Sequence, residues 1–216
     1  MCFSAEASFA ASAVLGAGGI WTLSLAPSPA ERPLARIPLL FSVQQFAEGV
    51  VWVGVANDER ALALVFSYAF AFFALFLWPV YIPLASLRAE PSAGRRRIQE
   101  ALCVVGLCAA VFISGSLARH PLEVSIEGGH LFYRMSLPLL YESLALYFVA
   151  VSAPCFSSFG YLRAFGGLLL ASLAATLWSH AEQFISLWCF FAAALSALIL
   201  LHFRRQRRLL VVAVSR

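Results

Sequence analysis

The sequence predicts an all-α integral membrane protein built as a bundle of seven transmembrane helices. Its composition is 62% hydrophobic and only 12% charged, whereas a soluble domain has about a quarter of its residues charged. Seven apolar segments spread along the whole chain approach the roughly 20 residues that cross a bilayer. One transmembrane domain over residues 1–216 is therefore expected, with spans at about 5–25, 37–56, 61–84, 98–117, 137–154, 161–178 and 181–203.

The last two spans are separated only by residues 179–182. A single helix of about 40 residues would be about 60 Å long, twice the thickness of the hydrocarbon layer. The chain is therefore expected to fold back here as a helical hairpin.

Arginine, the only strongly basic residue in the chain, predicts the orientation of the spans. Twelve of the fifteen arginines fall in the connections 26–36 and 85–97, in the connection before the sixth span, and in the C-terminal tail. Since positive charge accumulates on the cytoplasmic side, the N-terminus is expected outside and the C-terminus in the cytoplasm. This role explains the net charge of +4, so the expected partner is the lipid bilayer and not nucleic acid. The oligomeric state is left open.

The connection between the fourth and fifth spans predicts a short β-hairpin over the outer mouth of the bundle. Residues 122–126 and 130–133 alternate between apolar and polar, and Glu127-Gly128-Gly129 between them is typical of a turn. An ordinary solvent-exposed loop is the alternative.

The second span carries polar residues at its centre. On a helix, Gln44, Glu48 and Trp52 lie on one face because they are four residues apart. A carboxylate near the middle of a membrane costs at least a few kcal/mol unless it is paired, protonated or facing water. Glu48 is therefore expected to face the bundle interior, with donors from a set comprising Gln44, Gln45, Ser186, Trp188, Ser4 and Cys2.

The predicted orientation places four carboxylates within or bordering the spans, those of Glu6, Glu48, Glu142 and Glu182, in the outer half, and the inner half is expected to hold no acid. This one-sided clustering predicts an acidic polar site that opens outward, where Cys2 and Cys189 also approach each other. The candidate ligand-binding residues are Cys2, Ser4, Glu6, Gln44, Gln45, Glu48, Trp52, Glu142, His180, Glu182, Ser186, Trp188 and Cys189.

Several of these residues have a purely structural alternative. Glu6 and Glu182 begin helices, where a negative charge meets the positive end of the helix dipole. Glu142 sits near the predicted interface, His180 is placed to cap a helix, and glutamines commonly join membrane helices by hydrogen bonds.

Three functions remain open from the sequence. The first is binding or transport of a small polar ligand, a cation or a proton, and the lack of a polar path through the inner half favours binding. The second is a membrane-embedded enzyme that uses the same Glu, His and Cys residues for metal-assisted hydrolysis or thiol chemistry. The histidines show no HxxxH or HExxH spacing, and no catalytic residue, metal or cofactor is identified. The third is a structural accessory subunit.

Four motifs together resemble an uncharacterised family of bacterial multi-spanning membrane proteins, a domain of unknown function. They are Met-Cys-Phe-Ser-Ala-Glu-Ala-Ser-Phe at the N-terminus, residues 40–52, Gly-His-Leu-Phe-Tyr at 129–133 and Leu-Trp-Cys-Phe-Phe-Ala-Ala at 187–193. Members of that family open with Met-Cys-Phe-Ser-Ala or Met-Cys-Trp-Ser-Ala. The resemblance covers nearly the whole chain and implies a multi-pass protein of the bacterial cytoplasmic membrane, without an established activity.

Overall fold

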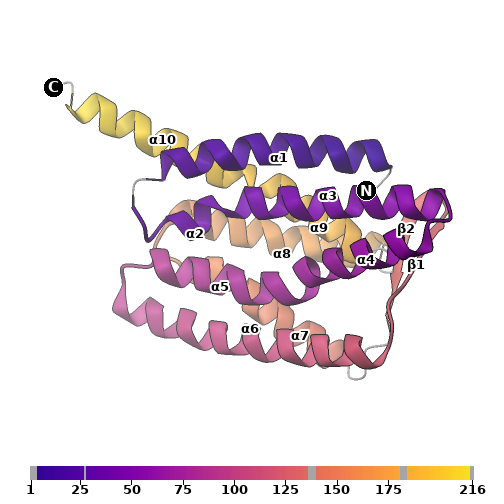
Figure 1. Ribbon diagram of the computed structural model, residues 1–216. Helices are drawn as coiled ribbons and strands as arrows, with labels where there is room; N and C mark the ends of the chain where they lie inside the picture. The colour runs from indigo at the N-terminus through magenta and orange to yellow at the C-terminus, as the bar shows by residue number, and fades with distance from the viewer. Residues whose placement is uncertain (1–3, 27, 136–139, 181–183, 215–216) are drawn as a thin grey trace.

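The computed structural model is a bundle of long helices with a small β-hairpin at one end (Figure 1). It describes residues 4–26, 28–135, 140–180 and 184–214. The first half of the chain contains α1 (Ala5–Leu25), the short α2 (Arg32–Ala35), α3 (Ile37–Ala56), α4 (Arg60–Ala71), the π-helical segment η1 (Phe72–Leu77), α5 (Trp78–Ala89) and α6 (Ala93–Arg119). The second half contains β1 (Glu123–Glu127), β2 (His130–Arg134), α7 (Leu140–Val151), the 3-10 segment η2 (Ala153–Phe156), α8 (Gly160–His180), α9 (Phe184–Leu195) and α10 (Ala197–Val214).

Six helical segments in the described part of the chain are long and apolar enough to cross a membrane. They are Ala5–Leu25, Arg32–Ala56, Arg60–Ala89, Ala93–Arg119, Gly160–Trp178 and Ile185–Arg207. Helix α7 has 12 residues, which cover about 18 Å at 1.5 Å per residue and fall short of the roughly 30 Å hydrocarbon layer. A seventh spanning helix therefore stays a prediction.

Helices α8 and α9 fold back on each other. The indole Nε1 of Trp188 donates a hydrogen bond of 3.2 Å to the carbonyl of Leu169. In one continuous helix these residues would be about 28 Å apart. The chain therefore reverses between α8 and α9, as expected.

The third span is one rod with a π-helical segment at its centre, which the sequence analysis did not predict. Pro79 and Pro83 follow this segment within α5 and lack the N–H that an α-helix needs. The hydroxyl of Tyr147 on α7 donates to the carbonyl of Ala74 inside the segment at 2.7 Å. The rod continues to Ala89, and α6 begins at Ala93, so the expected connection 85–97 is reduced to three residues.

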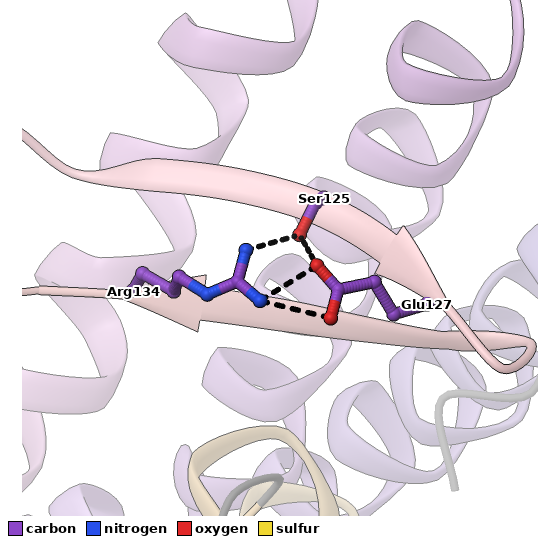
Figure 2. Close-up of polar contacts among 3 residues, drawn as sticks. All are labelled: Ser125, Glu127 and Arg134. Atoms are coloured by element: carbon purple, nitrogen blue, oxygen red, sulfur yellow. Dashed lines mark hydrogen bonds and ion pairs between the residues drawn. The ribbon is translucent and has the colours of Figure 1, made fainter.

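The expected β-hairpin is confirmed. Strands β1 and β2 pair antiparallel, with Glu127 opposite His130, and both turn residues, Gly128 and Gly129, have positive φ, as a two-residue hairpin turn of type I′ requires. On its outward face the Arg134 guanidinium lies 2.7 Å from Glu127 Oε1 and donates to Ser125 Oγ at 3.2 Å (Figure 2). This clasp holds the two strands to each other.

Helix α1 packs closely along α3. A Cβ placed on Gly19 would lie 2.6 Å from the backbone nitrogen of Leu39, so only glycine permits this approach. Ser42 Oγ donates to the Ser12 carbonyl at 2.7 Å, and Ser12 Oγ donates to the Ser42 carbonyl at 2.9 Å. These contacts fix the side of α3 that faces α1 and leave its next face, with Glu48, for the bundle interior.

Candidate functional site

Glu48 on α3 is fully buried, with an exposed fraction of 0%. Ser186 Oγ on α9 donates a hydrogen bond of 2.7 Å to Glu48 Oε1, and Gln45 Nε2 donates one of 3.2 Å to Glu48 Oε2. Both donors belong to the set expected from the sequence. The hydrogen bond from Ser186 joins α3 to α9, two helices that are far apart in the sequence.

Gln44 extends this centre to a third helix. Its Oε1 accepts a hydrogen bond of 2.6 Å from the indole Nε1 of Trp78 on α5, and the Trp78 ring stacks on Phe41 with ring centroids 3.9 Å apart. The thiol of Cys189 on α9 also interacts with the Gln44 side chain. We call Gln44, Gln45, Glu48, Ser186 and Cys189 the Glu48 centre.

Trp78 is a partner that the sequence analysis missed. Tryptophans near the ends of spans are explained by the membrane interface, but Trp78 lies well inside the Arg60–Ala89 segment. A buried indole N–H usually has a hydrogen-bond acceptor. The position of Trp78 inside its span therefore indicates a buried hydrogen-bond acceptor nearby.

Three polar atoms along two turns of α3 have no hydrogen-bond partner in the described part of the chain: Gln44 Nε2, Gln45 Oε1 and Trp52 Nε1. The Cys189 thiol interacts with Gln44 but makes no hydrogen bond of good geometry with its Nε2. Gln44 and Gln45 are fully buried and Trp52 is 8% exposed. Leaving a buried polar atom unsatisfied costs about 1–3 kcal/mol. Beside Glu48, the interior face of α3 therefore offers one donor and one acceptor to a further polar group, and Trp52 offers another donor one helical turn beyond.

Other candidate residues do not join the Glu48 centre. Glu6 and Glu142 are exposed, and Ser4 caps α1 by accepting a hydrogen bond from the Ala7 N–H at 3.2 Å. The indole of Trp188 is buried, but it donates to Leu169 and not to Glu48 as expected. For Glu6, the position in the first turn supports the structural alternative.

Three of the predicted site residues fall outside what the structure describes. They are Cys2, Glu182 and the side chain of His180. Cys189 is buried with an exposed fraction of 3%, and its expected approach to Cys2 stays a prediction.

A second buried carboxylate, Glu90, lies at the opposite end of the bundle, between α5 and α6. It is 2% exposed and accepts hydrogen bonds from the backbone nitrogens of Ser92 at 3.1 Å and Ser158 at 2.7 Å. The hydroxyls of Ser157 and Ser158 also donate to it. Burial by itself raises the pKa of Glu90, but these hydrogen bonds outweigh it and lower the pKa below its usual value. The expectation that this half of the bundle holds no acid is therefore wrong.

Arginines of the same end bind backbone carbonyls near Glu90. Arg95 and Arg163 both donate to the carbonyl of Ser157, at 2.8 and 2.9 Å, and Arg96 donates to that of Glu90 at 3.3 Å. Together these contacts fasten the start of α8 to the α5–α6 connection. The expected orienting role of these arginines is accompanied by a structural one.

The described residues contain no group of three or more His, Cys, Asp or Glu side chains arranged to hold a metal ion. Metal analysis of the purified protein stays the direct test of the enzyme alternative, since stoichiometric Zn, Fe or Cu would favour it.

A bundle of apolar, membrane-length helices around a buried polar centre is the architecture of a multi-pass membrane protein. The chain belongs to a family of unknown function, DUF6629, whose family model matches residues 1–215. This confirms the resemblance that the sequence motifs indicated. Comparisons with curated proteins and with solved structures gave no match.

Proposed function

We propose that this protein binds a small polar ligand, a cation or a proton at the Glu48 centre. The observation that carries this proposal is a fully buried carboxylate beside two buried glutamine atoms, Gln44 Nε2 and Gln45 Oε1, that lack partners in the described part of the chain. A bound polar species that meets these atoms would recover part of the free energy lost in burying them. Ionisable groups in such positions commonly mark ion or proton pathways.

The space beside the centre favours the smallest of these ligands. Two cavities that Tyr147, Trp188 and Cys189 line have volumes of about 10 and 20 Å³. A single water molecule needs about 10–15 Å³ measured in this way. Their lining does not include Gln44, Gln45, Glu48 or Ser186, so neither cavity holds a ligand against the carboxylate. A proton, which needs no cavity, therefore fits this closed arrangement best, whereas an organic ligand requires the bundle to open.

The membrane setting is part of the proposal. Glu48 follows Ile37 by eleven residues and precedes Ala56 by eight, so it lies closer to the hairpin end of α3. The arginines of α2, of the ends of α5 and α6 that flank their connection, and of the C-terminal part of α10 lie at the other end (Figure 1). With that end cytoplasmic, the centre lies nearer to the outer side of a bacterial cytoplasmic membrane.

A structural role for the same centre is the second candidate. The hydrogen bond from Ser186 to Glu48 and that from Trp78 to Gln44 join three helices, which favours a purely structural network. Such bonds between membrane helices contribute about 0.6 kcal/mol on average and up to about 2 kcal/mol.

Glu48→Gln separates the two candidates because it keeps the shape and removes the charge. A binding role predicts a folded protein that no longer takes up small cations or protons in calorimetric titration. Glu142→Gln, which alters an exposed carboxylate, serves as the matched control and retains binding. Unchanged titration of Glu48→Gln together with lower thermal stability would contradict binding and support the structural role.

A further inference from the structure

The β-hairpin closes the end of the bundle that is nearer to Glu48. Strand β1 contacts α3 and α4, and β2 contacts α9. Leu131 of β2 is 1% exposed and forms an apolar cluster with Val51 and Trp52 of α3; we call these three residues the plug. Trp52 lies one helical turn beyond Glu48 on the same face of α3.

A groove of about 560 Å³ lies beside the plug, between the α3–α4 turn and β1. Val55 and Val124 line this groove and also pack against the plug. Its charged lining residues are Asp58, Arg60 and Glu123, which give two negative charges and one positive. The plug therefore stands between a groove with net negative charge and the buried Glu48 centre.

The two strands of the hairpin are joined to each other on one face and packed on the bundle with the other. Val124, Ile126, Leu131 and Tyr133 form its inner apolar face, while the clasp of Arg134, Glu127 and Ser125 joins its strands on the outer face (Figure 2). An isolated two-stranded hairpin is only marginally stable, so its position depends on the contacts of its inner face with the bundle.

The closed plug also contains an unfavourable element. Trp52 Nε1 is buried in this apolar cluster without a hydrogen-bond partner in the described part of the chain. Displacement of the hairpin would let water reach this N–H and remove the cost.

We propose that the β-hairpin is the lid of the Glu48 centre, with Leu131 and Trp52 as its gate and the charged groove as the vestibule from which a cation or a proton arrives. This inference rests on the proposed function, because it names the route to that site.

The native thiol of Cys189 reports on the gate because it is buried within the Glu48 centre. Cys155 lies elsewhere in the bundle, half-buried against Gly166 near the start of α8, and reports on structural changes away from the gate. With Cys2, Cys103 and Cys108 replaced by Ser, the labelling rates of the two remaining thiols are measured with a charged, water-soluble maleimide and peptide mass spectrometry.

We expect Leu131→Ala to raise the labelling rate of Cys189 by about tenfold or more, because loss of a buried leucine favours the open arrangement, while the rate at Cys155 stays unchanged. Phe132→Ala, on the opposite face of the same strand, is the matched control and leaves both rates unchanged. Equal Cys189 rates in the two variants would overturn the lid.

If Leu131→Ala raises the labelling rates of both thiols, the substitution has unfolded the bundle. The Trp52→Phe variant then tests the gate instead. This change keeps an aromatic ring but removes the unpartnered N–H, so a gate predicts slower Cys189 labelling, and an unchanged rate would overturn the proposal. The labelling experiment and the Glu48 titration can give different answers. If the Cys189 labelling rates change as expected but Glu48 binds neither a cation nor a proton, the hairpin is still the lid, and only the proposed function is contradicted.

Discussion

At the scale of single residues, the Glu48 centre depends on hydrogen bonds whose partners come from different helices. Glu48 and Gln45 belong to one helix, and the sequence alone placed them close together. Ser186 reaches Glu48 from 138 residues away, so this bond tests the packing of α3 against α9.

Ser186→Ala removes the donor to Glu48 Oε1. We expect the free energy of unfolding to fall by about 1–2 kcal/mol, since a buried acceptor loses its partner. Reversible unfolding in mixed detergent measures it. Ser172→Ala, which removes only a hydrogen bond to Leu169 on its own helix, is the control and changes stability by less than about 0.5 kcal/mol. Equal effects of the two changes would contradict the contact.

Glu90 makes stability depend on pH. Because its hydrogen bonds lower its pKa in the folded protein, Glu90 stabilises the fold fully above the unfolded value of about 4.3 and loses that contribution as pH falls through the lower folded value. We expect Glu90→Gln to reduce stability at pH 7 and to flatten its decline below about pH 4.5. Thermal unfolding measured across this range tests it. The control is Glu100→Gln, at an exposed position, which keeps the wild-type dependence of stability on pH. If Glu90→Gln also keeps that dependence, Glu90 is not the group that stabilises the fold.

The sequence predicted Gln44, Gln45, Glu48 and Ser186 as neighbours. The reason is that polar side chains inside apolar spans avoid lipid and pair with one another in the bundle interior. It missed Glu90, whose partners at 157 and 158 come from a distant connection. It also grouped Glu6 and Glu142 with Glu48 by depth alone. Depth in the membrane does not say which way a side chain points around its helix.

At the scale of elements, apolar length predicted the helices well where their ends carry polar residues. Helices α1 and α3 cover residues 5–25 and 37–56, the same ranges as the first two expected spans. The π-helical segment Phe72–Leu77 was missed because its residues are uniformly apolar. The only sign of it was the pair of prolines that follow, and prolines within a span permit several distortions.

The close approach of α5 and α6 gives a test at this scale. A Cβ on Gly106 would lie 1.9 Å from the carbonyl oxygen of Pro79, so Gly106→Ala forces the helices apart. We expect it to lower the free energy of unfolding by about 1–3 kcal/mol. Gly115→Ala, on the same helix with nothing within 4 Å, has the opposite sign and stabilises by up to about 1 kcal/mol. A stabilised Gly106→Ala protein would show that the packing is wrong.

At the scale of the whole molecule, the distribution of arginine predicts the orientation in the membrane. Gly94 lies at the arginine-rich end, is exposed and has no atom within 4 Å of its Cβ position, so a cysteine there is tolerated and accessible. We expect Gly94→Cys to react with an impermeant thiol reagent only in inverted vesicles. Reaction in intact cells would reverse the orientation.

The proposed function requires that the buried Glu48 carboxyl group exchanges a proton or binds a small cation. Infrared difference spectroscopy of the purified protein, recorded as pH or the concentration of sodium, potassium or calcium is changed, observes that group directly. We predict a carboxyl or carboxylate band that responds to pH or to a cation. This band disappears in Glu48→Gln and persists in Glu142→Gln. Spectra in which Glu48→Gln and the wild-type protein respond identically to every change would contradict it.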